Sequence, residues 1–221
     1  MLAGSGLLMW IGGNGLVTWS EQHADSGLAA LLVSTMPLWA AAVAAVVDRR
    51  RPSWRLLVAL LVGFTGVGVL TWPVLRHGSR ADTQAVVALV AAPLLWSIGS
   101  LWYQRRQLAI SIHAASAWQH LAGAVGFALL VALTGEPRPT PTPTAWAAWV
   151  YLVLFGSVIA FTSYITALRR LPMSVASTYA YANPVIAVVL GRLVLHEPLT
   201  AWTVAGAILV LAGIAGVFHE R

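Results

Sequence analysis

The sequence contains no cysteine and no lysine, and only 9% of its residues are charged. Without cysteine, disulfide bonds, thiolate metal sites and cysteine nucleophiles are all excluded. Soluble domains contain about 25% charged residues, so this chain has too few charges to cover a surface that faces water. With 59% hydrophobic residues and a mean hydropathy of +0.79, the composition indicates that lipid is the surrounding solvent.

Apolar runs of about 20 residues, the length that crosses a bilayer, recur along the whole chain. No segment between them is long enough to form a soluble domain. We therefore predict an all-α integral membrane protein, a polytopic bundle of about eight transmembrane helices. The predicted spans are 2–19, 27–47, 54–73, 84–104, 113–134, 145–168, 174–195 and 200–218.

The 13 basic residues are all arginine, and they form short clusters between the apolar runs. An excess of arginine marks the cytoplasmic side of a membrane protein, so both ends of the chain are predicted to be cytoplasmic, in a bacterial inner membrane. There is no basic face outside the membrane, so no nucleic-acid partner is expected. The richer side holds Arg49, Arg50, Arg51, Arg55, Arg105, Arg106, Arg169, Arg170 and Arg221, and the other side holds Arg76, Arg80, Arg138 and Arg192.

The chain aligns with itself when it is shifted by 147 residues, a shift that places Pro37 on Pro184. The corresponding connections carry opposite charge, because residues 20–25 are acidic and residues 167–172 are basic. Equivalent spans lie an odd number of spans apart, so they cross the bilayer in opposite directions. The pattern predicts an inverted-topology repeat, an architecture common among secondary transporters. The predicted units are 1–73, with three helices of the first repeat, and 82–221, with the five helices of the second.

The two matched prolines lie inside runs that otherwise have the pattern of a helix. An interior proline removes one backbone hydrogen bond, and in lipid the freed carbonyl must find another partner or line a wet cavity. Either proline by itself is consistent with a packing kink that has no function. As a symmetric pair, Pro37 and Pro184 are predicted to bend two helices near the bilayer midplane, where they gate the cavity in which substrates bind.

Three segments, residues 13–39, 180–200 and 205–217, resemble the EamA-type permeases of the drug/metabolite transporter superfamily. The second repeat carries the family's loop motif as Glu197-Pro198, followed by spaced glycines, whereas the first repeat keeps only Pro52 of that motif. The resemblance implies ten helices in two inverted repeats, a cytoplasmic C-terminus and alternating access through a central cavity. Against that pattern, the chain is expected to lack the first two helices.

Polar and aromatic side chains within the spans are the candidates for contact with a solute. Tyrosine and tryptophan combine an apolar body with a polar tip, which suits a cavity for amphipathic molecules. His120 has two interpretations, a neutral side chain bonded to a neighbouring helix or a contact to substrate or proton. Trp10 and Trp39 are predicted instead to fill gaps between helices. The candidates for the substrate cavity are Asn14, Trp96, Gln119, His120, Tyr164, Tyr179 and Asn183.

The predicted function is a membrane transporter, a permease or exporter of small amphipathic metabolites such as amino acids or related compounds. There is no Ser/His or Asp/Asp arrangement at mid-depth, and residues 196–198 lack the second histidine of a zinc-binding helix, so no catalytic residue, metal site or cofactor is expected, and the protein is not expected to be an enzyme. The expected partners are the lipid bilayer and a small-molecule solute, together with a second copy of the chain in a homodimer. The alternative is a non-transporting membrane subunit, or a truncated fragment, that needs a partner copy.

Overall fold

The computed structural model describes residues 1–75, 82–106, 108–137, 139–194 and 200–220, and over these ranges its elements are all helices. Several residues of the sequence analysis, namely Arg76, Arg80, Arg138, Arg221 and the Glu197-Pro198 motif, lie outside the described residues. The elements are α1 (Leu2–Leu7), the π-helical η1 (Leu8–Gly15), α2 (Leu16–Ser20), α3 (Ser26–Val33), α4 (Met36–Asp48), α5 (Trp54–Leu75), α6 (Thr83–Arg105), α7 (Ile112–Thr134), α8 (Pro143–Tyr151), the π-helical η2 (Leu152–Phe161), α9 (Thr162–Arg170), α10 (Met173–Ala176), α11 (Tyr179–Val194) and α12 (Ala201–His219).

Within the described ranges, seven helical segments are long and apolar enough to cross a membrane. They correspond to seven of the predicted spans, and the prediction of an all-α polytopic membrane protein is confirmed. The remaining predicted span, 2–19, is a continuous helix formed by α1, η1 and α2, but it is not one of the seven. Asn14 and five glycines make this helix less apolar than the others.

Side-chain caps explain where three of the long helices begin. The hydroxyl oxygen of Ser111 accepts a hydrogen bond from the backbone N–H of Ala114 at the start of α7, at 3.1 Å. Thr142 caps α8 in the same way, and Thr200 caps α12. Each cap satisfies one of the N–H groups that a helix start leaves without an intrahelical partner, which lipid could not do.

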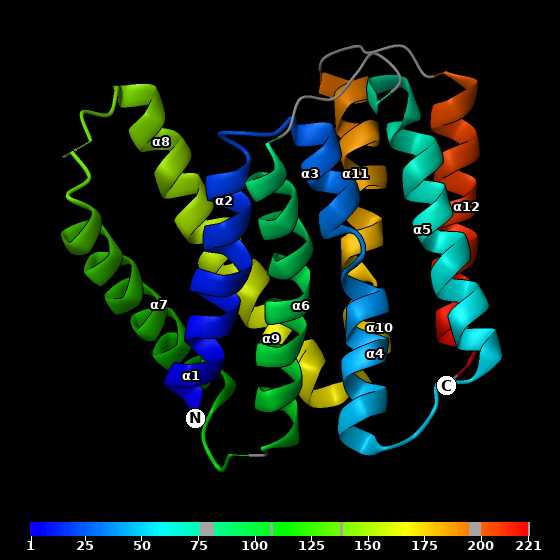
Figure 1. Ribbon diagram of the computed structural model, residues 1–221, viewed down its shortest axis with the longest axis horizontal. Helices are drawn as coiled ribbons and strands as arrows, with labels where there is room; N and C mark the ends of the chain where they lie inside the picture. The colour runs from blue at the N-terminus through cyan, green and yellow to red at the C-terminus, as the bar shows by residue number, and fades with distance from the viewer. Residues whose placement is uncertain (76–81, 107, 138, 195–199, 221) are drawn as a thin grey trace.

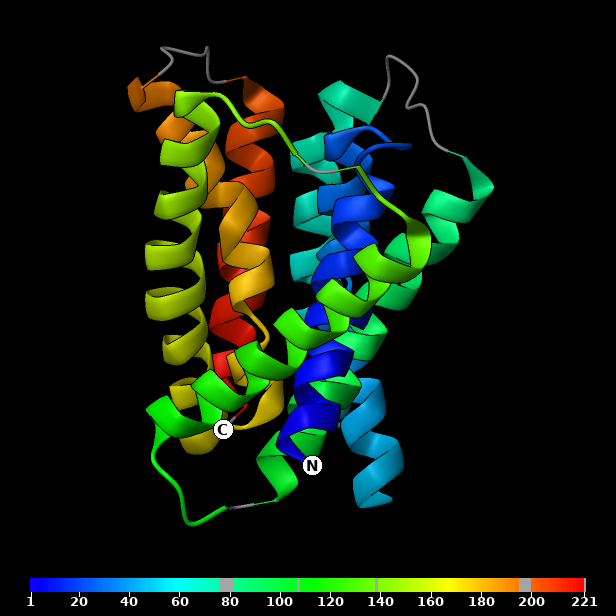
Figure 2. The same ribbon diagram turned by 90° about the vertical axis from the view of Figure 1, so that its left-hand side faces the viewer.

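The helices stand side by side, with α7 and α8 at one edge of the bundle and α5 and α12 at the other (Figure 1). Both termini lie at the same end as the α4–α5, α6–α7 and α9–α10 connections, and the second view agrees (Figure 2). This end carries the clusters Arg49–Arg51, Arg105–Arg106 and Arg169–Arg170, and we call it the arginine end.

Two of the spans are broken, and the breaks place the two matched prolines differently. The span Ser26–Asp48 breaks at Ser34 and Thr35, so Pro37 lies in the first turn of α4 and not in a helix interior as predicted. At that position proline costs no helical hydrogen bond, because the N–H that it lacks would have no intrahelical partner. The span that begins at Met173 breaks at Ser177 and Thr178, and Pro184 lies inside α11, as the sequence predicts.

Helices α5 and α12 run antiparallel and pack closely along their length (Figure 1). Gly66 of α5 and Gly213 of α12 leave no room for a side chain, since a β-carbon on either would fall within 2.5 Å of the other helix's backbone. Small residues at such crossings let the backbones of membrane helices approach closely. This close packing stabilises the pair, because lipid supplies no hydrophobic drive for helix association.

Candidate functional site

A cleft of about 670 Å³ lies between η1, α6, η2 and α9, with single residues of α10 and α11 completing its lining. We call it the aromatic cleft. Four of the predicted cavity residues lie in its lining, namely Asn14, Trp96, Tyr164 and Tyr179. These residues come from four different helical segments, so the fold brings together side chains up to 165 positions apart.

Both π-helical stretches contribute to the aromatic cleft. Trp10 and Asn14 come from η1, and Leu152, Gly156, Ser157, Ala160 and Phe161 come from η2. A π-helical turn is rare, widens the backbone spiral and is found often at functional sites. The wider turn in η1 is accompanied by a close approach to α6, because a β-carbon on Gly13 would lie 2.6 Å from the Trp96 ring.

The walls of the aromatic cleft are a connected series of rings. The Trp10 ring lies 5.0 Å from that of Phe161, and the Trp96 ring lies 5.7 Å from that of Tyr164, measured between centroids. Tyr164 in turn meets Tyr179 edge to face at 5.2 Å. The rings of these three pairs are inclined to one another by 44°, 43° and 68°, and together they give the cleft an apolar aromatic lining that suits the body of an amphipathic molecule.

Polar groups in the aromatic cleft are few and are spread over several helices. Asn14 is exposed to it, and Ser157 and Ser163 lie on the side formed by η2 and α9. The indole N–H group of Trp10 is buried and has no hydrogen-bond acceptor within the described part of the chain. An apolar pocket with a small number of placed donors and acceptors is the usual form of a small-molecule site.

His120 and Gln119 lie behind the cleft wall and not in it. The His120 ring packs 4.6 Å from both Trp10 and Phe161, and its Nδ1 lies 2.9 Å from the carbonyl oxygen of Ser116. Gln119 is fully buried, and its Nε2 donates to the hydroxyl of Ser5 at 3.0 Å. Both side chains therefore join α7 to the N-terminal helix, and His120 reaches the cleft only through the rings in front of it.

Asn183, the last predicted cavity residue, is exposed and does not line the aromatic cleft. Tyr179 lies one turn before it in α11, and a spacing of four residues places the two on the same helix face. The structure nevertheless brings only Tyr179 to the cleft, where its hydroxyl lies 3.7 Å from the Met36 sulfur. The described residues contain no group of three metal-binding side chains, in this cleft or elsewhere.

The segment from α6 to α12 matches a known family. Residues 83–219 correspond to the EamA-like transporter family, and they make up more than half of the chain. The chain belongs to the EamA-like transporter family. The resemblance noted in the sequence is confirmed, and the fold is accordingly that of an integral membrane protein of transporter type.

Relatives of this EamA-family chain are similar over most of its length. The uncharacterized inner membrane transporter YedA of Escherichia coli (strain K12) is 31% identical over 211 residues, which cover 92% of this chain and 66% of the relative. A probable terminal-alkyne amino-acid exporter of Streptantibioticus cattleyicolor is 27% identical over 201 residues, which cover 90% and 66%. This chain thus spans slightly less than two thirds of the length of these relatives.

A solved crystal structure has the same fold as this EamA-family chain. It superposes with a TM-score of 0.80, covering 100% of this chain and 77% of the other, at 19% sequence identity. At that identity the likeness concerns the fold alone.

Trp10 and Phe161 are cleft residues of this EamA-family chain that were not predicted from the sequence. Trp10 was expected only to fill a gap between helices, yet its ring forms part of the cleft wall. A signal was present in the repeat alignment, because the shift of 147 places Asn14 on Phe161 and Trp10 on Ser157. All four residues line the cleft, so applying the shift to the predicted residue Asn14 would have found Phe161, although neither Trp10 nor Ser157 was predicted.

Proposed function

We propose that the protein is a transporter that exports small amphipathic metabolites, such as amino acids or related compounds, by alternating access. The observation that carries this proposal is the aromatic cleft, whose rings and few polar groups lie within a bundle of membrane helices. A relative named as a probable amino-acid exporter supports this class of solute. The proposed site of action is the bacterial inner membrane, with the arginine end in the cytoplasm.

The proposal includes two inverted repeats, residues 1–73 and 82–221. Equivalent helices begin 147 residues apart in two cases, α3 at Ser26 with α10 at Met173, and α5 at Trp54 with α12 at Ala201. The π-helical stretches η1 and η2 overlap under the same shift. Equivalent helices also run in opposite directions, as α5 and α12 do in Figure 1, which is the arrangement expected for an inverted repeat.

Contacts between α5 and α12 support the same repeats. A β-carbon on Gly66 would lie 2.5 Å from the backbone nitrogen of Val210, and one on Gly213 would lie 2.4 Å from that of Gly63. The shift of 147 converts the first of these contacts into the second. Two helices related by a two-fold axis must exchange their contacts in this way. The two contacts are therefore consistent with an axis that passes between α5 and α12.

In the proposed mechanism, the broken spans move relative to the rest of the bundle and open the aromatic cleft to one side at a time. Each break precedes a matched proline, Pro37 in α4 and Pro184 in α11. A short break between helical segments absorbs backbone rotation more readily than a continuous helix does. Tyr179 begins the helix that follows the second break, so movement there displaces a cleft residue directly.

An efflux assay tests the proposal. Cells of an exporter-deficient host are loaded with amino acids from dipeptides, and the external amino acids are measured with and without expression of the chain. Expression should accelerate efflux, and Trp96→Leu should raise the apparent KM at least about tenfold, because a wall of the cleft is lost. Trp118→Leu is the matched control, since Trp118 is 58% exposed and lies outside the cleft.

The assay also separates the alternative function. Efflux equal to that of the empty vector, from a chain shown to be folded in the membrane, would exclude transport by this polypeptide alone. Equal effects of the two tryptophan variants would reject the aromatic cleft as the substrate site.

A further inference from the structure

A second cleft, of about 760 Å³, opens at the arginine end and is separate from the aromatic cleft. We call it the arginine cleft. Its lining comes from the end of α4, the α4–α5 connection, the end of α6, and the α9–α10 turn. These are the ends of membrane-spanning segments, so the cleft lies where lipid headgroups meet water.

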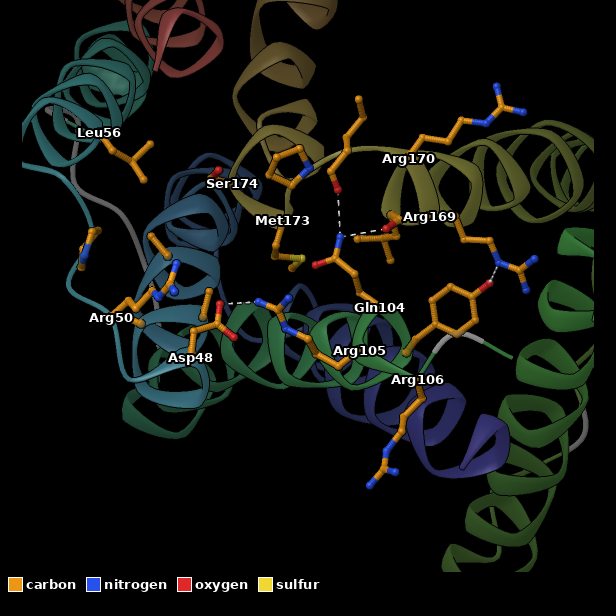
Figure 3. A pocket seen from close by; sticks show the side chains of 18 of the residues that line it. Asp48, Arg50, Leu56, Gln104, Arg105, Arg106, Arg169, Arg170, Met173 and Ser174 are labelled. Carbon is orange, nitrogen blue, oxygen red and sulfur yellow. Dashed lines mark hydrogen bonds and ion pairs between the residues drawn. The ribbon is translucent and has the colours of Figure 1, made fainter. Parts of the chain in front are cut away.

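The described residues that line the arginine cleft carry a strong excess of positive charge. Asp48 is the one carboxylate among them, and it is paired with Arg105 (Figure 3). Arg169 is also engaged, since its Nε donates to the hydroxyl of Tyr103 at 2.6 Å and its terminal nitrogen donates to the carbonyl oxygen of Ile110 at 2.8 Å. The lining arginines are Arg50, Arg51, Arg105, Arg106, Arg169 and Arg170.

Four of these arginines have no partner for their guanidinium groups within the described ranges, namely Arg50, Arg51, Arg106 and Arg170. All four are exposed, and Figure 3 shows Arg106 and Arg170 extending outward from the rim. A guanidinium group pairs well with the oxygens of a phosphate, which it can bind through two parallel hydrogen bonds. The rim therefore offers phosphate-binding groups at the depth of the headgroups.

The inner part of the arginine cleft is apolar and built from small side chains. Ala41, Ala44 and Ala45 of α4 face it, together with Leu56 and Met173. Gln104 is fixed beside it, because its Nε2 donates to the carbonyl oxygens of Leu168 and Leu171, each at 2.8 Å. An apolar interior behind a cationic rim matches a molecule with a charged head and an apolar body better than it matches a free anion.

We propose that the arginine cleft binds an anionic phospholipid, with its phosphate on the rim arginines and its glycerol backbone and first acyl carbons against the alanines of α4. Basic pockets between membrane helices on the cytoplasmic side bind anionic headgroups through the same chemistry. The site joins α4 to α6 and α9, so the bound lipid bridges the two proposed repeats at the arginine end.

Native mass spectrometry of the full chain in detergent tests this site. The chain is titrated with phosphatidylglycerol and, separately, with phosphatidylcholine of the same acyl chains, and the apparent Kd of the first bound lipid is measured. Arg50→Gln combined with Arg170→Gln should weaken phosphatidylglycerol binding by about fivefold per lost charge and leave phosphatidylcholine binding within about twofold. Asp48→Asn should tighten phosphatidylglycerol binding, because it removes the opposing charge.

The control is Arg55→Gln combined with Arg192→Gln, which removes two charges from residues outside the cleft lining. Each variant is first shown to be monodisperse and helical. Equal affinity for the two lipids, or an equal loss in the control, would overturn the proposal. A third titration uses inorganic phosphate as competitor, and displacement of the lipid at comparable concentrations would show a site for free anions and reject the lipid.

Discussion

The hydroxyl groups of Tyr164 and Ser100 lie 2.7 Å apart, and the hydrogen bond between them joins α9 to α6 beside the aromatic cleft. Both residues are buried, and Ser100 is fully so. In a bundle surrounded by lipid, a buried hydroxyl has few other partners, and this bond fixes the direction in which the Tyr164 ring faces the cleft.

Replacement of Tyr164 by phenylalanine should therefore cost stability without changing the shape of the cleft. Loss of the hydroxyl leaves Ser100 with only a 3.4 Å contact to the Met9 sulfur, and we expect a loss of about 1–2 kcal/mol in the free energy of unfolding. Thermal unfolding in detergent measures it. Tyr151→Phe is the control, because Tyr151 is 59% exposed. Equal stability of the two variants would contradict the role of the bond.

Methyl groups added at the α5–α12 crossing should separate these helices. Gly66→Ala and Gly213→Ala each place a β-carbon within 2.5 Å of the opposite backbone, and we expect each to destabilise the protein by about 1–3 kcal/mol. Gly68→Ala is the control on the same helix, since nothing lies within 4 Å of its β-carbon position. The thermal unfolding midpoints of the three variants are compared. A midpoint for Gly68→Ala as low as those of the other two would show a general effect of substitution.

The matched prolines are expected to act on transport more than on folding. Pro184→Ala restores an N–H inside α11, and Pro37→Ala relaxes the start of α4, so the double variant should keep its stability and lose at least about tenfold in efflux rate. The efflux assay measures the rate, with unfolding measured in parallel. Pro143→Ala, at the start of α8, is the control. Unchanged efflux from the double variant would remove the gating role.

The absence of cysteine permits a direct topology experiment. Single-cysteine variants at Ser53 and Leu108 report on the arginine end, and variants at Thr83 and Thr140 report on the opposite end, all at exposed positions. A membrane-impermeant maleimide added to intact cells should label only the second pair, because the arginine end is proposed to be cytoplasmic. Labelling of Ser53→Cys and Leu108→Cys from different sides would be incompatible with the fold.

The class of the protein and the positions of most of its helices could be predicted from the order of its amino acids. Seven predicted spans agree closely with the helices, as 113–134 does with Ile112–Thr134. Length decides this, because a bilayer requires about 20 apolar residues in a row and a helix is the only single-segment structure that satisfies its own backbone there. The family was also readable from local motifs, and residues 83–219 confirm it.

The set of side chains that meet in the aromatic cleft depended on how the helices pack against one another. Gln119 and His120 were predicted to face a cavity, yet both turn toward the N-terminal helix, while Trp10 was expected only to fill a gap and forms part of the wall. A helix that is apolar all round carries no amphipathic pattern, so its sequence does not reveal which face points inward. Helix rotation, the two π-helical stretches and the close approach at Gly13 set that direction, and they arise from packing between helices.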